Sequence, residues 1–306
     1  MINSQFEIAL HAPFDLRGVL QSHGWAQLLP NIYTQKDASL RRVEELTSGV
    51  IVTLRVCEKA LPGGRKIMVD VTHASALSDA ERADIQSRVR HMLRLDEDLN
   101  EFEQACARHG PPWSNLPRGA GRLLRSPTLF EDMLKVICTT NIQWSGTCRM
   151  QAELVAACGK SLPGDPSQKS FPRPEDISGM PLETFQESVR LGYRAAFIHA
   201  LAQRAAADPD WLGSFWDTGR TSADIRKELL SIKGIGNYAA AAGMMLLGRY
   251  DDLPVDSVFL QFMRAKYFHM EEFDLQHAQE VYADWGRWKA LAYWLEMTQH
   301  DSQAGG

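Results

Sequence analysis

The chain has 306 residues, of which 44% are hydrophobic and 23% are charged, and its formal net charge is −5. This length and composition exclude low-complexity, collagen-like and disordered proteins, and they predict a soluble globular protein of about two domains. The longest uncharged apolar run, Ala239–Gly248, is too short to span a membrane, so no membrane partner is expected.

The cysteines are odd in number and widely spaced, which argues against a disulfide framework and favours reduced thiols in a cytoplasmic compartment. They are Cys57, Cys106, Cys138, Cys148 and Cys158.

The negative charge is unevenly distributed along the chain. Residues 96–117 carry −4 and residues 271–306 carry −5, whereas residues 1–95 and 118–270 each carry +2. An overall charge of −5 argues against a nucleic-acid partner, but a nearly neutral 118–270 segment does not.

Residues 1–75 are predicted to be rich in β-structure. Val52, Leu54 and Val56 alternate with other residues, as do Ile67, Val69 and Val71, and Pro62-Gly63-Gly64 marks a turn between the two runs. This pattern predicts an antiparallel pair. Ser78 and Glu81 then have capping-box spacing, so residues 79–95 are expected to form an amphipathic helix.

Prolines at 111, 112 and 117 indicate a domain boundary, after which the pattern is helical. Thr128 and Glu131 predict a second capping box. The proline-rich stretch 159–181 is expected to be a loop, and helices are expected at about 182–190, 194–206 and 222–231. The predicted fold is α+β, with an N-terminal antiparallel domain over 1–112 and an all-α domain over 113–306.

The segment from Leu229 to Ala240 contains two closely spaced glycines, Gly234 and Gly236. Two glycines at this spacing permit a tight hairpin between helices and leave backbone amides bare, so that they can bind an anion such as a phosphate. An ordinary helical hairpin, in which the glycines only allow close packing, remains the alternative.

Twenty residues beyond Gly236, the run Pro254-Val255-Asp256 precedes a predicted helix that carries Phe259 and Phe262. The positive end of that helix dipole would stabilise the ionised Asp256 carboxylate. The alternative is that Asp256 serves only as a helix N-cap, a common role for Asp.

The Gly-rich hairpin followed by Pro-Val-Asp resembles the helix-hairpin-helix DNA glycosylase superfamily, and in particular the branch that holds the alkylbase (3-methyladenine) and 8-oxoguanine DNA glycosylases. Further motifs of that branch are similar to Ile137–Asn141, Leu191–Ala195 and Trp285-Gly286-Arg287-Trp288. The resemblance covers roughly residues 118–300, and more faintly 14–110, where the family has an antiparallel β-domain.

This resemblance implies that Asp256 is catalytic, because the family uses this Asp to stabilise the oxocarbenium-like sugar and to help activate water. It also implies that Asn141 fills the gap left by a flipped nucleotide. The other implied DNA-binding residues are Arg194, Lys233, Gly234, Ile235 and Gly236. Lys233 stands where the family usually has Pro; it either reaches a phosphate or faces solvent.

No cofactor is implied as a requirement, although the family often holds a monovalent cation, Na⁺ or K⁺, on hairpin carbonyls. The corresponding residues here are Leu230, Ile232 and Ile235. Other branches hold an iron–sulfur cluster on four cysteines after the catalytic Asp. This chain has no cysteine beyond Cys158, so no iron–sulfur cluster is expected there.

The implied base pocket contains Trp144, Tyr238, Tyr293 and Met297. The alternative is half-buried packing on the second hairpin helix for Tyr238, and core packing for Tyr293 and Met297. The bifunctional glycosylase/lyases have a Lys at the position of Tyr238, and the 8-oxoguanine enzymes have Gln and Phe at 293 and 297. A phenol cannot form a Schiff base, and aromatic rings attract a cationic base. These departures favour a monofunctional enzyme that acts on alkylated or deaminated purines.

The implied function is that of a base excision repair glycosylase that flips a damaged purine out of double-stranded DNA and hydrolyses its N-glycosidic bond. We expect a monomer, associated with the nucleoid in the cytoplasm if the chain is bacterial, with modest affinity for undamaged DNA and a shallow salt dependence. Two alternatives remain: an 8-oxoguanine-type glycosylase/AP lyase, and a non-catalytic helix-hairpin-helix protein that binds distorted DNA.

Overall fold

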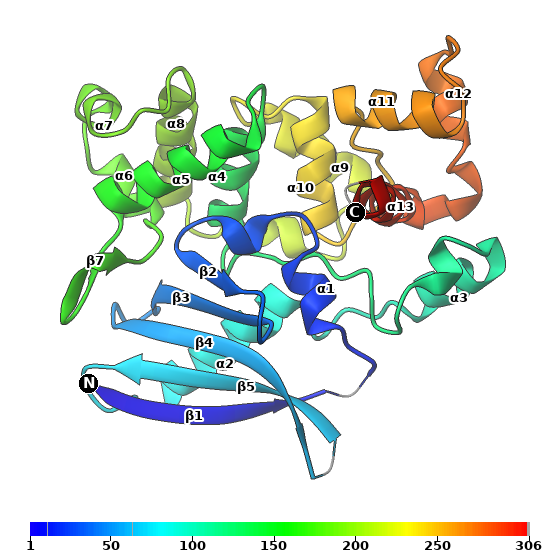
Figure 1. The fold of residues 1–306 in the computed structure, drawn as a ribbon. Coiled ribbons are helices and arrows are strands. Elements are labelled where there is room, and N and C mark those ends of the chain that lie inside the picture. Colours follow the sequence, from blue (N-terminus) through cyan, green and yellow to red (C-terminus); the bar gives the residue numbers. More distant parts are fainter. Residues whose placement is uncertain (11, 63, 305–306) are drawn as a thin grey trace. The chain divides into compact units, whose positions relative to one another are not determined.

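The computed structural model describes residues 1–10, 12–62 and 64–304. An N-terminal antiparallel sheet is followed by a mostly helical region, which confirms the predicted α+β class (Figure 1). The sheet has the strand order β1-β5-β4-β3-β2. Its strands are β1 (Ile2–Ala9), β2 (Asn31–Thr34), β3 (Ser39–Glu45), β4 (Ile51–Leu61) and β5 (Gly64–His73).

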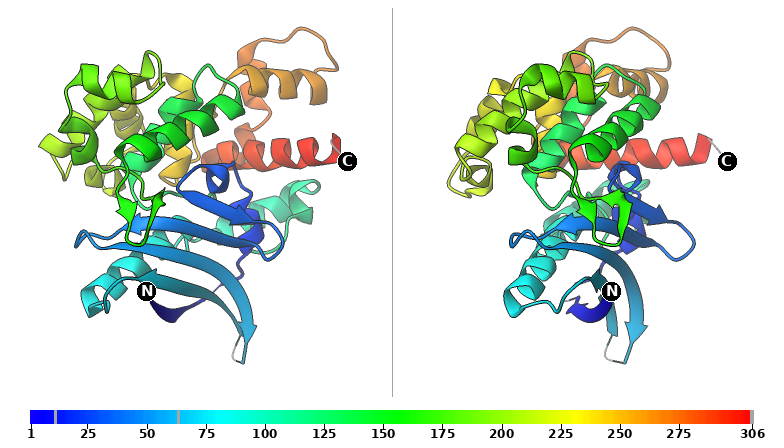
Figure 2. Two further views of the ribbon diagram at one scale, coloured as in Figure 1. Left: turned by 60° about the vertical axis from the view of Figure 1, so that its left-hand side comes forward. Right: turned by 90° about the vertical axis from the view of Figure 1, so that its left-hand side faces the viewer.

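The predicted hairpin is the β4–β5 pair, whose register runs from Thr53↔Thr72 to Leu61↔Gly64. Gly63 of the predicted turn lies outside the described residues. Alternate residues of β4, including Val52, Leu54 and Val56, are buried because successive side chains of a strand point to opposite faces. Helix α2 (Asp79–Leu93) lies along one face of the sheet in both views of Figure 2.

The remaining helical elements follow in chain order. Two short helical elements, α1 (Leu16–Leu20) and η1 (Trp25–Gln27), lie between β1 and β2 in the chain. The elements that follow α2 are α3 (Asn100–His109), η2 (Trp113–Asn115), α4 (Leu129–Thr139), α5 (Trp144–Cys158), α6 (Pro174–Ser178), α7 (Leu182–Ser188), α8 (Arg194–Ala207), η3 (Gly213–Trp216), α9 (Ser222–Ser231), α10 (Asn237–Leu246), α11 (Ser257–Lys266), α12 (Leu275–Glu280), η4 (Ala283–Trp288) and α13 (Lys289–Ala304). None of the helices in the described part of the chain is long and apolar enough to cross a membrane.

Two local predictions need correction. The stretch 159–181 is not only loop, because it contains the small β6 (Ser161–Leu162) and β7 (Asp165–Lys169) pair and helix α6. Thr128 does cap α4 by accepting from the Glu131 amide. The Glu131 carboxylate, however, binds Arg42 and Lys135 instead of completing the box. The Ser78–Glu81 box is present as predicted.

The chain forms two compact units. Unit 1 comprises Met1–Glu97 and Arg122–Gly213, and unit 2 comprises Asp98–Gly121 and Ser214–Gly306. The predicted boundary between residues 112 and 113 falls inside the first segment of unit 2. The compact units therefore do not follow that boundary, and the assignment of domains to 1–112 and 113–306 stays a prediction.

Buried ion pairs join the sheet of unit 1 to its helices. Arg42 on β3 donates to the Glu131 carboxylate on α4 at 3.0 Å, and Lys135 donates to Glu131 at 2.7 Å. All three side chains are at most 3% exposed. Arg42 also pairs with the buried Glu44 at 2.7 Å. Because an unpaired charge is costly to bury, these buried groups depend on one another for partners.

Aromatic side chains attach the 98–121 segment to the rest of unit 2. The Trp113 indole donates to the carbonyl of Ala292 at 2.9 Å, and its ring centroid lies 4.9 Å from that of Trp285. Phe102 on α3 lies 5.9 Å from Trp285 and 5.5 Å from Trp288. These contacts explain why a segment distant in sequence belongs to the C-terminal unit.

Candidate active site

The predicted site residues are divided between the two compact units. Asn141, Trp144 and Arg194 belong to unit 1. Unit 2 holds the hairpin, Tyr238, Asp256, Tyr293 and Met297.

The predicted hairpin is present between α9 and α10. Helix α9 ends at Ser231, and α10 begins at Asn237. The Ile232 amide donates to the Leu229 carbonyl, and the Ile235 amide donates to the Ile232 carbonyl, both at 3.0 Å. Gly234 between them has φ +91°, a conformation that L side chains rarely adopt. The turn is therefore tight and depends on a glycine at 234.

Gly236 is the N-cap of α10, and no side-chain hydrogen bond caps this helix within the described residues. A Cβ built on Gly236 would meet nothing within 4 Å, so the space beside this N-cap residue is open. Backbone N–H groups of a helix start that lack a capping side chain are suited to an anion. Lys233 is exposed in the same turn.

The three carbonyls predicted to hold a monovalent cation lie in the same hairpin. That of Ile232 already accepts the Ile235 amide. Those of Leu230 and Ile235 accept no hydrogen bond within the described residues. Carbonyl oxygens are suitable ligands for a hard cation, and two of the three have both lone pairs available, so this donor set fits such an ion.

Asp256 is the N-cap of α11. Its Oδ1 accepts from the Phe259 amide at 2.8 Å, and the Phe259 side chain is fully buried. Within the described residues its other oxygen, Oδ2, accepts no hydrogen bond. The carboxylate is half-buried, so one oxygen fixes its orientation while the other remains available to a ligand.

Tyr238, on the first turn of α10, lies close enough to Asp256 to be affected by its charge. Burial of the phenol and the negative charge of Asp256 raise the pKa of Tyr238 to about 12. The hydroxyl is therefore protonated at neutral pH. The hairpin's second helix and the predicted catalytic acid are thus neighbours within unit 2.

Two arginines fix the loop that leads to Asp256. Arg226 on α9 donates from Nε to the Asp252 carboxylate at 2.6 Å and from Nη2 to Oδ1 of Asn237 at 3.1 Å. Arg249 donates to the carbonyl of Arg220 at 2.8 Å. No sequence motif marks Arg226, because its partners lie 11 and 26 residues away in the chain.

Tyr293 and Met297 on α13 are buried, with Tyr293 only 1% exposed. Tyr293 meets the rings of Phe259, Phe262 and Tyr282 edge to face, at centroid distances of 5.0, 5.8 and 5.8 Å. This placement favours the packing alternative for Tyr293. Its role in a base pocket stays a prediction.

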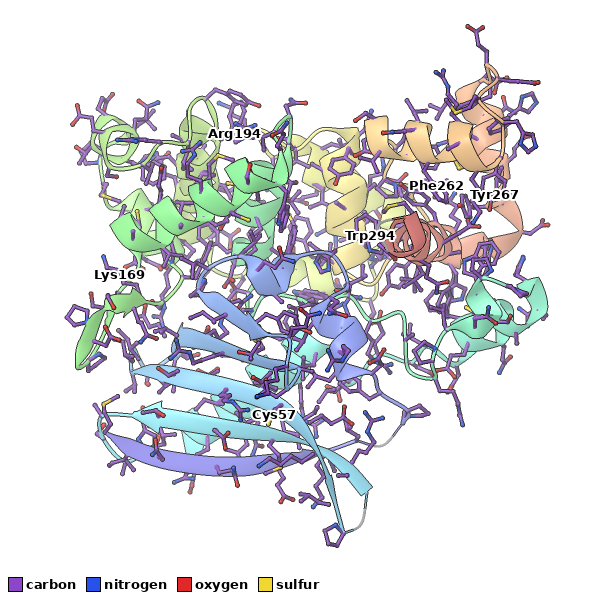
Figure 3. All side chains as sticks on the ribbon, viewed as in Figure 1. Cys57, Lys169, Arg194, Phe262, Tyr267 and Trp294 are labelled. Atoms are coloured by element: carbon purple, nitrogen blue, oxygen red, sulfur yellow. The ribbon has the colours of Figure 1, made fainter. Side chains whose placement is uncertain are left out.

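A buried carboxylate lies beside Tyr293 on the same helix. Glu296 accepts from the hydroxyls of Tyr267 at 2.7 Å and Tyr282 at 2.5 Å. The ring of Tyr267 also meets that of Phe262 edge to face at 6.4 Å; Figure 3 labels both residues. Burial and the charge of Glu296 raise the pKa of both tyrosines. The cluster therefore connects the end of α11 to α13.

In unit 1, Asn141 lies in the turn between α4 and α5, is exposed, and has φ +50°. Asn tolerates this left-handed conformation better than most residues. Arg194, labelled in Figure 3, donates to the carbonyls of Thr140 and Asn141. Because Arg194 is only 6% exposed, this placement favours a role in holding the Asn141 turn over direct contact with DNA.

Trp144 is 38% exposed at the start of α5. Its indole Nε1 donates to the Gln27 side chain at 3.0 Å, and its ring occupies the position that a Cβ on Gly24 would need. Trp144 therefore packs on the segment that contains η1, and its membership of a base pocket stays a prediction.

Comparison with solved structures gives several extensive similarities to DNA glycosylases. A 3-methyladenine DNA glycosylase from Archaeoglobus fulgidus matches 95% of this chain and 96% of its own, with a TM-score of 0.72 and 18% identity. An 8-oxoguanine glycosylase/lyase from Clostridium acetobutylicum, in complex with double-stranded DNA that contains cytosine opposite 8-oxoguanine, matches 99% of each chain, with a TM-score of 0.69 and 15% identity. The chain has the fold of these glycosylases.

The fold implied by the sequence motifs is thereby confirmed over nearly the whole chain, including the N-terminal part where the resemblance was faint. No protein-family model matches the sequence, and neither does any curated protein. At 15–18% identity the similarity establishes the fold, and fold alone does not assign a reaction.

Proposed function

We propose that this chain is a DNA glycosylase of base excision repair, which removes a damaged base from double-stranded DNA. The observation that carries the proposal is the link between Asp256 and the hairpin: its carboxylate is oriented by the α11 cap, and Arg226 bonds both the loop before Asp256 and the first residue of α10. A protein that only binds DNA has no need of an anion beside a phosphate-binding hairpin.

In the proposed reaction, the hairpin amides and Lys233 bind backbone phosphate, and Asn141 fills the stack when the damaged nucleotide leaves it. The bond between C1′ and the base nitrogen breaks, with its electron pair leaving on the base. The Asp256 carboxylate stabilises the positive charge that develops on the sugar. The oxygen of a water molecule then bonds to C1′, and Asp256 helps to remove the water proton.

The carbonyls of Leu230, Ile232 and Ile235 would hold a monovalent cation, which would add positive charge at the phosphate-binding end of the hairpin. The other groups proposed to bind phosphate belong to the chain itself: the uncapped amides at the start of α10, and the exposed Lys233. The cation is therefore proposed as a structural group without a part in breaking the bond.

We further propose that the enzyme is monofunctional and prefers alkylated or deaminated purines. Support comes from Tyr238, a protonated phenol at the position where a lyase needs an amine. The second candidate is an 8-oxoguanine glycosylase/AP lyase. It is favoured by the similarity to the Clostridium enzyme, which is an 8-oxoguanine glycosylase/lyase.

A base-release assay tests the proposed function. Duplexes should carry 3-methyladenine, 7-methylguanine, hypoxanthine, ethenoadenine, 8-oxoguanine or uracil, and release is expected from at least one alkylated or deaminated purine. Borohydride trapping on the 8-oxoguanine duplex separates the two candidates, since a covalent adduct would support the lyase.

Asp256→Asn is expected to lower the release rate by on the order of 10²–10³-fold, because it removes the charge opposite the developing cation. Asn is also a good N-cap, so the bond to the Phe259 amide and the fold should persist. Asp251→Asn is the matched control, since Asp251 is an exposed acid five residues earlier in the chain. Undiminished release by Asp256→Asn would rule out Asp256 as the catalytic carboxylate.

A further inference from the structure

The loop that presents Asp256 and the hairpin that would grip DNA are connected through one side chain, that of Arg226. It projects from α9, the first helix of the hairpin. Nε donates to Asp252, four residues before Asp256, and Nη2 donates to Asn237, the first residue of α10. Arg226 therefore contacts both structures that the proposed reaction must bring to the same nucleotide.

The shape of the guanidinium makes this double contact possible. Its planar donors point in fixed, different directions, so that one Arg can hold a carboxylate and an amide oxygen at a set separation. Arg249 also fixes the loop, but it donates to the carbonyls of Asp217 and Arg220 and to the hydroxyl of Ser222, at or before the start of α9. Arg226 thus supplies an attachment close to the α10 N-terminus.

The exposure of the pair argues against a mainly stabilising role. The side chains of Arg226 and Asp252 are 34% and 29% exposed. Ion pairs as accessible as this contribute little to folding. Catalysis, in contrast, is sensitive to small errors of position, and a displacement of about 1 Å can lower a rate on the order of 10²-fold.

We propose that Arg226 is a positioning residue for Asp256. By holding Asp252 and Asn237 together, it fixes the distance between the phosphate-binding start of α10 and the carboxylate of Asp256, so that DNA gripped by the hairpin presents its sugar to that carboxylate. This inference rests on the proposed glycosylase function.

The test is a comparison of single-turnover excision rate with DNA affinity, on the lesion that wild-type protein releases. Arg226→Gln and Asp252→Asn are each expected to lower the excision rate about 10- to 100-fold while leaving affinity for the duplex nearly unchanged. The double variant should be no slower than the slower single variant, because both substitutions remove the same Arg226–Asp252 interaction. Arg226→Lys should recover part of the rate, since Lys reaches Asp252 but lacks the fork that also holds Asn237.

Arg220→Gln is the matched control. Arg220 forms an ion pair with Glu228 on α9, at 2.9 Å and with exposures of 23% and 24%, and its side chain also contacts Ser214 and the ring of Phe215 in η3. A wild-type rate in Arg226→Gln would overturn the proposal. So would equal rate losses in Arg220→Gln and Arg226→Gln, because they would indicate a general effect of weakening α9.

A measurement on the free protein distinguishes failure of this inference from failure of the proposed function. Amide hydrogen exchange over residues 250–256 should be faster in Arg226→Gln than in wild type, and unchanged in Arg220→Gln. If wild-type protein releases no base from any duplex, the glycosylase proposal falls. Unchanged exchange over residues 250–256 in Arg226→Gln would independently show that Arg226 does not restrain this loop.

Discussion

Tyr238 occupies the position where a lyase carries its amine, and its surroundings determine the protonation state of its phenol. The phenol is half-buried and has a pKa of about 12 beside Asp256. Its protonation therefore does not change over the physiological pH range, and it is not expected to contribute an inflection to the pH–rate profile at neutral pH.

Replacing Tyr238 tests the monofunctional assignment at the level of one residue. Tyr238→Phe should retain base release, because the proposed chemistry uses the ring and not the hydroxyl. Tyr238→Lys should yield a borohydride-trapped adduct with a lesion-containing duplex, whereas wild type should yield none. Trapping by the wild-type protein would contradict the monofunctional assignment.

The two hairpin glycines should respond differently to the same substitution. Gly236 has φ −91° and open space at its Cβ position, so Gly236→Ala should fold normally. The added methyl group would stand before the amides of α10, and DNA affinity should therefore fall. Gly234 has φ +91°, so Gly234→Ala should instead lose about 1 kcal/mol of stability. Thermal melts and duplex titrations measure the two effects, and unchanged DNA affinity in Gly236→Ala would count against phosphate binding at these amides.

At the scale of elements, α4 is attached to the sheet of unit 1 by charge as well as by apolar packing. Glu131 lies between Arg42 and Lys135, and all three are buried. The two cations overcome the effect of burial and lower the pKa of Glu131 to about 2. Because this carboxylate is ionised in the folded state, it neutralises charges that would otherwise be costly to bury.

Glu131→Gln is accordingly expected to destabilise the protein by about 3–5 kcal/mol, since the buried Lys135 would lose its carboxylate partner and Arg42 would lose one of its two, keeping Glu44. Glu153→Gln on α5 should cost less than about 1 kcal/mol, because its ion-pair partner Arg149 is 50% exposed and the Gln oxygen can still accept from the Arg190 amide. The folded pKa of Glu131 lies below its ordinary value of 4.5. Its contribution is thus complete above pH 4.5 and lost as the pH falls towards 2. Denaturant melts across this range should show a shallower acid loss in the variant; equal slopes would contradict the assignment.

For the whole molecule, the distribution of charge limits how DNA can be held. Unit 1 has 22 basic and 22 acidic residues, whereas unit 2 has 11 basic and 16 acidic residues, so the whole net charge of −5 lies in unit 2. The unit with the hairpin is therefore acidic, and any grip on phosphate must depend on local amides and a few cations rather than on a broad positive field.

The salt dependence of binding to undamaged duplex tests this view. Each phosphate contact contributes about −0.9 to the slope of log K against log salt concentration, so a few contacts predict a slope of roughly −3. The Lys233→Gln variant should reduce the magnitude of the slope by about 1 if Lys233 contacts a phosphate. A wild-type slope of roughly −6 or steeper would show that a broad electrostatic surface had been missed.

The sequence by itself determined what depends on neighbours within a turn or a strand. Alternation predicted the β4–β5 pair, Ser78 and Thr128 marked helix starts, and the spacing of Gly234, Gly236 and Asp256 identified the hairpin and the cap of α11. These features are local because a cap, a turn or a buried face is formed by residues a few positions apart.

Only the tertiary structure decided the pairings between distant residues. It placed Glu131 beside Arg42, joined the 98–121 segment to the C-terminal unit, directed Arg194 at the carbonyls of the Asn141 turn and set Arg226 between Asp252 and Asn237. Many acids and bases in the chain could form such pairs, and nothing local distinguishes the pairs that do form. Burial selects among them, because a charge or polar group removed from water requires a partner at the place where the fold has put it.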